Sequence, residues 1–179
     1  VPFDAPPFVL GPLSIAAFNA LYYAAGRDGT GFSGLTSFFF PLDAVGAWNR
    51  LYGRRGFVQY QALLPREAAA EGCRRILEEI SRERAASFLA VLKTTGAEGR
   101  GLLSFPRPGI TLALDIPNVG VRLRPLARRL DEIVLKAGGR LYLAKDSLTD
   151  APTFAAMYPR LAEFRAAQGR LDPRGRFSS

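Results

Sequence analysis

The order of apolar patterns between residues 57 and 145 is the feature that most limits how this chain can fold. Alternation, in which every second residue is apolar, predicts strands at 57–64, 87–94, 110–116 and 140–145. Apolar stripes at helical spacing predict helices at 66–82 and 125–137, which open at Pro65 and Pro125. This order matches the split βαβ, or ferredoxin-like (βαββαβ), arrangement. We therefore expect an α+β fold with an antiparallel sheet and both helices on one face.

The segments on either side of this core predict further helices. Before the core, helical spacing appears at 14–25 and 42–52, and 35–40 is a strand candidate that ends in three phenylalanines. After the core, 152–158 and 159–168 predict two short helices. We divide the chain into N-terminal helices and a strand (1–55), the ferredoxin-like core (56–147) and C-terminal helices with a tail (148–179). The abrupt start and end lead us to expect one part of a longer protein.

Composition excludes several kinds of catalytic site. The chain has no histidine and one cysteine, so it offers no Ser-His-Asp triad, no histidine-ligated metal site and no internal disulfide. It has only three lysines, Lys93, Lys136 and Lys145, and lysine is the more adaptable cation at a reactive site. A lysine, a carboxylate, a tyrosine or a bound cofactor must therefore carry any chemistry.

The net charge of +8 favours anionic partners, although the basic residues are dispersed along the chain. The proline-rich start lacks the charged region of a signal peptide, and no apolar run reaches the roughly 18 residues of a membrane span. We expect a cytoplasmic protein, in solution or peripheral to a membrane.

Alternation also sorts the strand side chains between the two faces of the sheet. The helix-covered face takes the apolar sets, which include Tyr60, Leu92 and Leu114. The other face collects polar side chains around the small residues Ala113 and Ala144, namely Gln59, Gln61, Lys93, Thr111, Asp115 and Tyr142. Amides, a tyrosine and a single lysine are typical of a lined pocket, and an ordinary solvated sheet face is the alternative. Alternation places Lys145, the last strand residue, on the core side, from which it could swing around the sheet edge.

Several short motifs occur in a specific order along the chain. They are PheProLeuAsp (40–43), TrpAsnArgLeuTyrGly (48–53), GlyPheValGlnTyrGln (56–61), SerPheProArgProGly (104–109), GlyGlyArgLeuTyrLeuAlaLysAspSer (138–147) and MetTyrPro (157–159). Together they resemble the C-terminal half of the flavin-linked oxidoreductases that include decaprenylphosphoryl-ribose oxidase, in the vanillyl-alcohol-oxidase superfamily. Sugar-lactone and alditol oxidases of that superfamily resemble the chain more distantly. Thr111 and Ala113 depart from the ribose-oxidase pattern, which has Asn and Cys there.

The resemblance implies a substrate-binding, or cap, domain of an FAD-dependent oxidase that oxidises a sugar hydroxyl by hydride transfer to the flavin. An N-terminal domain of the same protein would bind most of the FAD, and the substrate would be a sugar, free, phosphorylated or lipid-linked. Carried over by motif, the substrate would contact Gln59, Gln61, Lys93, Arg50 and Thr111. Tyr142 would lie at the flavin edge, and Lys145 would be the catalytic residue at the junction of flavin and substrate. No metal ligand is implied.

A non-catalytic module that binds nucleic acid or another anionic partner is the alternative. An open ferredoxin-like sheet on a basic chain also suits RNA recognition, and ArgGlyPheValGlnTyr (55–60) partly echoes an RNA-binding signature. That signature belongs on the third strand, however, and the open face lacks the paired stacking aromatics of such modules. The pattern therefore favours the oxidoreductase.

Overall fold

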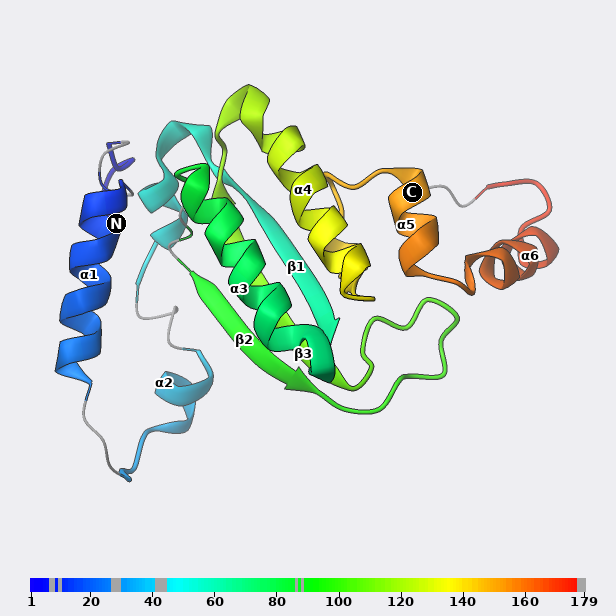
Figure 1. Ribbon diagram of the computed structural model, residues 1–179, viewed down its shortest axis with the longest axis horizontal. Coiled ribbons are helices and arrows are strands. Elements are labelled where there is room, and N and C mark those ends of the chain that lie inside the picture. The colour runs from blue at the N-terminus through cyan, green and yellow to red at the C-terminus, as the bar shows by residue number, and fades with distance from the viewer. Residues whose placement is uncertain are drawn as a thin grey trace.

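We describe the protein from a computed structural model, whose described residues are 1–6, 9, 11–26, 30–40, 45–85, 87 and 89–176. A four-stranded antiparallel sheet forms its centre, with the strand order β2-β3-β1-β4 (Figure 1). The strands are β1 (Phe57–Pro65), β2 (Ala90–Thr95), β3 (Gly109–Pro117) and β4 (Arg140–Leu141). The predicted α+β class and the antiparallel sheet are therefore confirmed.

Two amphipathic helices cover one face of this sheet. Figure 1 shows α3 (Arg66–Arg82) and α4 (Leu123–Lys136) side by side in front of the strands, with the short 3-10 turn η4 (Gly120–Arg122) leading into α4. Between the helices and the sheet lies one apolar core, which includes Tyr60, Ala62, Leu64, Ile76, Leu112, Leu114, Ile116, Leu126, Leu130 and Val134. The even-numbered residues of β1 and β3 thus face the helices, as the alternation predicts.

Both helices end with the same backbone geometry. After α4, Gly138 takes a left-handed conformation (φ 68°), and the N–H of Gly139 donates to the carbonyl of Val134 at 2.7 Å. After α3, Arg84 takes the same left-handed conformation (φ 54°), and the N–H of Ala85 donates to the carbonyl of Ile80 at 3.0 Å. Glycine is the residue that occupies this position at least cost, so the arginine at the end of α3 is unusual.

The N-terminal region departs most from the sequence predictions. It contains α1 (Pro12–Ala25), α2 (Leu35–Phe39) and the 3-10 segment η3 (Trp48–Arg55). The predicted strand at 35–40 is wrong, because its three phenylalanines do not alternate with polar residues and the backbone closes its hydrogen bonds locally, Phe40 N–H donating to Thr36 O at 2.8 Å. Of the helix predicted at 42–52, residues 42–44 lie outside the described part, and the rest differs because η3 continues to Arg55.

Some apolar residues with a helix or strand pattern are exposed. On α1, Leu21 and Tyr22 are 72% and 75% exposed, since no described element packs over the helix. Leu92 is 63% exposed because β2 is an edge strand and α3 packs chiefly on β1 and β3. An apolar stripe indicates burial only where the fold supplies a partner surface.

The C-terminal region wraps around the β4 edge of the sheet. The strand predicted at 140–145 is shorter than expected, because β4 ends at Leu141 and the chain turns into the 3-10 segment η5 (Leu143–Lys145). Helices α5 (Ala151–Met157) and α6 (Leu161–Leu171) follow. Just after α5, the buried hydroxyl of Tyr158 donates to the carbonyl of Leu141. None of the helices in the described ranges is both long and apolar enough to span a bilayer.

Candidate functional site

Strand pairing brings the predicted site residues onto the sheet face opposite the helices. In the β1–β3 register, Gln59 pairs with Asp115, Gln61 with Ala113 and Leu63 with Thr111. In the β2–β3 register, Lys93 also lies opposite Thr111. Directly opposed residues of an antiparallel pair point to the same face, so these side chains form one patch, which we call the sheet-face site.

Asp115 is the acidic residue of the sheet-face site, and it is buried. Its side chain is 3% exposed, and its Oδ1 accepts a hydrogen bond of 3.1 Å from the Gln59 amide. Burial raises the pKa of this carboxyl, while the hydrogen bond from Gln59 and the positive charge of Lys145 act in the opposite direction. Asp115 is therefore a buried carboxyl whose pKa lies above its ordinary value despite these two favourable contacts.

Two buried oxygens of the sheet-face site have no hydrogen-bond partner within the described part of the chain. They are Oδ2 of Asp115 and Oγ1 of Thr111. Buried polar atoms are nearly always hydrogen-bonded in folded proteins, because an unmet one costs about 1–3 kcal/mol. These two atoms lie on either side of Ala113 along β3, and each has the capacity to accept a hydrogen bond from a polar group that reaches this face.

Lys145 reaches the sheet-face site because β4 ends early. The backbone turns at Tyr142, and the N–H of Lys145 donates to the Tyr142 carbonyl at 2.9 Å. Alternation does not apply inside this 3-10 turn, so its placement of Lys145 on the core side is wrong. The half-buried lysine instead lies close enough to Asp115 for its charge to lower the pKa of that carboxyl.

Tyr142 borders the same patch and connects it to a covering loop. Its N–H donates to the Gln61 carbonyl at 2.8 Å, and its ring packs against Phe105 with centroids 4.9 Å apart. The loop that carries Phe105 is also held by buried Arg140, which donates to Ser104 O (2.7 Å) and to Glu98 (2.8 Å). The sheet face is therefore covered at its Arg140 end and accessible at its Gln59 end, where the glutamine is exposed.

Two predicted substrate contacts lie at the margin of this arrangement. Lys93 shares the face but is exposed on edge strand β2. Arg50 donates to the carbonyl of Pro2 at 2.6 Å, so its guanidinium engages the N-terminal segment in this structure. The structure thus groups Gln59, Gln61, Thr111, Tyr142 and Lys145, and leaves Arg50 outside the group.

Sequence reasoning placed Asp115 on this face but assigned it no role. A signal was available in the pairing, since an aspartate opposite a glutamine forms a cross-strand hydrogen bond that fixes both side chains. The described residues contain no cluster of three or more acidic or cysteine side chains that could hold a metal ion. What the patch offers is a carboxyl, two amides, a hydroxyl and an ammonium group.

Comparison with known proteins gives the site a context. Residues 118–179 match the family model of D-arabinono-1,4-lactone oxidase (ALO). The chain is 46% identical over 145 residues to decaprenylphosphoryl-β-D-ribose oxidase of Mycolicibacterium smegmatis, a match that covers 81% of this chain and 31% of that protein. It is 42% identical over 55 residues to an alditol oxidase of a Streptomyces species, covering 31% of this chain and 13% of the oxidase.

A further relative aligns with the whole chain. It is an uncharacterised protein encoded in the mprA 5′ region of Streptomyces coelicolor, 34% identical over 186 residues, and the match covers all of this chain and 48% of that protein. The chain therefore spans about half the length, or less, of the curated relatives it matches. The resemblance inferred from the motifs is confirmed by these matches.

Proposed function

Since the chain is homologous to decaprenylphosphoryl-β-D-ribose oxidase over most of its length and has the lactone-oxidase match in its last third, we propose that it is the substrate-binding domain of an FAD-dependent oxidoreductase. The reaction would be oxidation of a hydroxyl on a sugar or sugar derivative. The observation that supports this proposal is the sheet-face site, where Asp115 accepts a hydrogen bond from Gln59 and is influenced by the charge of Lys145, and where Asp115 Oδ2 and Thr111 Oγ1 have no partner among the described residues.

In this proposal the flavin ring would lie over the sheet-face site with a hydroxylated substrate beside it. Small Ala113 lies at its centre between Gln61 and Val91, and polar groups surround it. When bound, FAD accepts the hydride from the carbon that carries the hydroxyl. An N-terminal domain of the same protein would hold most of the FAD, in keeping with the greater length of the relatives.

Each residue type suits the role we assign to it. The amides of Gln59 and Gln61 both donate and accept hydrogen bonds, as sugar hydroxyls require, and Lys93 and Thr111 would add contacts from β2 and β3. Tyr142 would lie along the edge of the flavin. The ammonium of Lys145, attracted by the Asp115 carboxylate, would stabilise the negative charge that develops as the hydride arrives.

Replacement of Lys145 in the full-length protein tests this proposal. Loss of one preorganised charged donor typically slows such a reaction by about 10²–10³-fold, so Lys145→Met should lower the rate of flavin reduction by that factor. Anaerobic stopped-flow bleaching of the flavin measures the rate directly. The substrates would be a panel of alditols, aldonolactones and ribosyl phosphates.

Lys136→Met is the matched control. It removes the same charge from an exposed position in the last turn of α4, where a cation complements the helix dipole by roughly 0.3–1 kcal/mol. Its reduction rate should stay close to that of the unmodified protein. If both variants reduce the flavin at nearly the rate of the unmodified protein, Lys145 has no part in the chemistry and the assigned site is wrong.

A further inference from the structure

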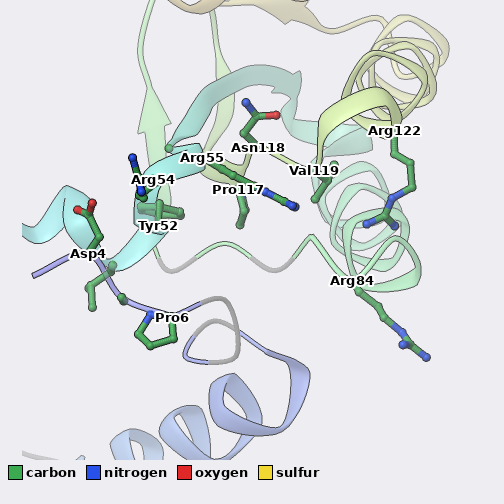
Figure 2. A pocket seen from close by; sticks show the side chains of 14 residues that line it. Asp4, Pro6, Tyr52, Arg54, Arg55, Arg84, Pro117, Asn118, Val119 and Arg122 are labelled. Carbon is green, nitrogen blue, oxygen red and sulfur yellow. The ribbon is translucent and has the colours of Figure 1, made fainter.

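A cavity of about 470 Å³ opens at the end of the sheet where β1 begins and β3 ends. Its wall comes from four separate stretches: the N-terminal segment, η3, Arg84 just beyond the end of α3, and the turn between β3 and α4. Figure 2 shows Arg55 and Arg122 extending toward the space between them from opposite sides, with Arg84 at the rim and directed outward. Small-molecule sites are typically 300–1,000 Å³, so this cavity has a suitable size for a ligand larger than a single ion.

The charges around the cavity are unbalanced. Four arginines line it, Arg54, Arg55, Arg84 and Arg122, against one carboxylate, Asp4. Arg122 is ion-paired with Glu83 at 3.5 Å, whereas Arg54, Arg55 and Arg84 form no ion pair within the described residues. Guanidinium groups bind phosphate oxygens through paired N–H donors, and this cluster leaves several such donors for a ligand.

The backbone around the adjacent arginines is fixed by close contacts. Gly53 and Gly56, which bracket Arg54 and Arg55, both take positive φ values, 61° and 67°. A Cβ on Gly53 would stand 2.7 Å from the carbonyl oxygen of Ala5, so the N-terminal segment crosses η3 at a distance that only glycine permits. The N–H of Ala5 also donates to the carbonyl of Arg50 at 2.8 Å. The segment from Gly53 to Gly56 is thus a loop of fixed backbone that presents two cations.

The remaining two arginines are also placed by the helix ends. Arg122 donates to the carbonyl of Glu83 at 3.0 Å, which fixes its side chain beside the end of α3. Arg84 occupies the left-handed position where α4 uses Gly138. A strained backbone position that persists is a reason to look for function, and here the strain keeps a cation at the cavity mouth.

We propose that this cavity binds a phosphate or diphosphate ester. The arginines would hold the anionic group, and the apolar side of the wall, which includes Tyr52 and Pro117, would take the organic part. The cavity lies near the sheet-face site, because the Phe57–Pro117 pair at its edge is one pleat repeat, roughly 7 Å, from the Gln59–Asp115 pair. The inference rests on the cavity alone and does not depend on the proposed oxidation.

Calorimetric titration of the whole chain with inorganic pyrophosphate, and separately with inorganic phosphate, tests the site. The double variant Arg54→Gln, Arg55→Gln removes two cations from the cavity wall, and it should weaken pyrophosphate binding at least tenfold, since each lost charged hydrogen bond is worth about that factor. The double variant Arg165→Gln, Arg170→Gln removes the same charge from exposed positions of α6 and should weaken binding less than twofold. The proposal would be overturned if the two double variants weakened binding equally. It would also be overturned if the unmodified protein bound neither of these anions nor vesicles of phosphatidic acid.

Two further measurements separate loss of binding from loss of folding and identify the source of the phosphate. Arg84→Gly relieves backbone strain, so this variant should melt at a higher temperature than the unmodified chain and yet bind pyrophosphate more weakly; unchanged binding would remove Arg84 from the site. Vesicles of phosphatidic acid, compared with phosphatidylcholine, report on a lipid headgroup. If the protein binds phosphatidic acid vesicles and the Arg54→Gln, Arg55→Gln variant does not, the ligand is a lipid phosphate. If the protein binds soluble pyrophosphate but not the vesicles, the ligand is a free phosphate ester.

Discussion

Replacement of Arg84 by glycine should make the fold more stable, although it removes a side chain. Arg84 is the residue after α3 with a left-handed backbone, and its side chain is exposed and makes no hydrogen bond or ion pair within the described residues. Gly138 holds the equivalent position after α4, and a Cβ added there would meet only Cγ of Pro65, at 3.9 Å. For the fold itself, substitutions at these two positions therefore change backbone strain and remove no hydrogen bond or ion pair formed by a side chain among the described residues.

The magnitude follows from two opposing effects. A left-handed conformation costs an L-residue roughly 1–2 kcal/mol, which Arg84→Gly would relieve. Glycine also gives the unfolded chain more conformational freedom, which costs about 0.4–1 kcal/mol. The net gain is about 0.5–1 kcal/mol, and Gly138→Ala should lose about the same amount for the same reasons.

Urea unfolding followed by circular dichroism measures both changes, and thermal melting should show shifts of about 2–4 °C per kcal/mol. Changes of opposite sign at the two helix ends would support the reasoning. Loss of stability in Arg84→Gly would refute it, because the arginine would then contribute more to the fold through its side chain than it costs through its backbone.

Two further predictions concern the core. The Oδ1 of Asp131 accepts a 2.9 Å hydrogen bond from the Tyr60 hydroxyl, and burial raises the pKa of the Asp131 carboxyl. The stability that the protonated carboxyl contributes is therefore fully present below the ordinary pKa of 3.8 and is lost as the pH rises through the native pKa. Asp131→Asn, which keeps an acceptor oxygen for Tyr60, should therefore cost less at pH 7 than at pH 4 in urea unfolding, and an equal cost at both pH values would contradict this. Gly139→Ala would place a Cβ 2.5 Å from the Leu63 carbonyl oxygen and 2.8 Å from Cγ1 of Val134, so it should lower the free energy of unfolding by about 1–3 kcal/mol; a neutral result in the same assay would show that β4 can move.

Alternation and helical spacing predicted the centre of the fold well, because those patterns report burial against a neighbouring layer. Strands β1 and β3 and helices α3 and α4 lie within two residues of their predicted bounds. The same alternation assigns Gln59, Gln61 and Thr111 to one face of the sheet, and the strand register places them there. Local pattern suffices where a strand is long and central.

Local pattern failed where position depends on what lies far away in the chain. The early end of β4, which brings Lys145 toward Asp115, comes from a turn that alternation cannot signal. The exposure of Leu92 depends on which strands α3 covers. The arginine cavity is assembled from stretches of chain that lie between Asp4 and Arg122 in the sequence, so no single motif indicates it.

The strand order has a consequence for how the protein forms during synthesis. Neither β1 nor β2 pairs with the other, and each finds its first partner in β3, which the ribosome makes later than both (Figure 1). Since synthesis proceeds at roughly 5–20 residues per second, β1 remains without a paired strand for several seconds, and the apolar face of α3 remains uncovered. During that interval only contacts local in sequence, such as those within α3, are available to the nascent chain, and the synthesis of β3 supplies the strand with which both β1 and β2 pair.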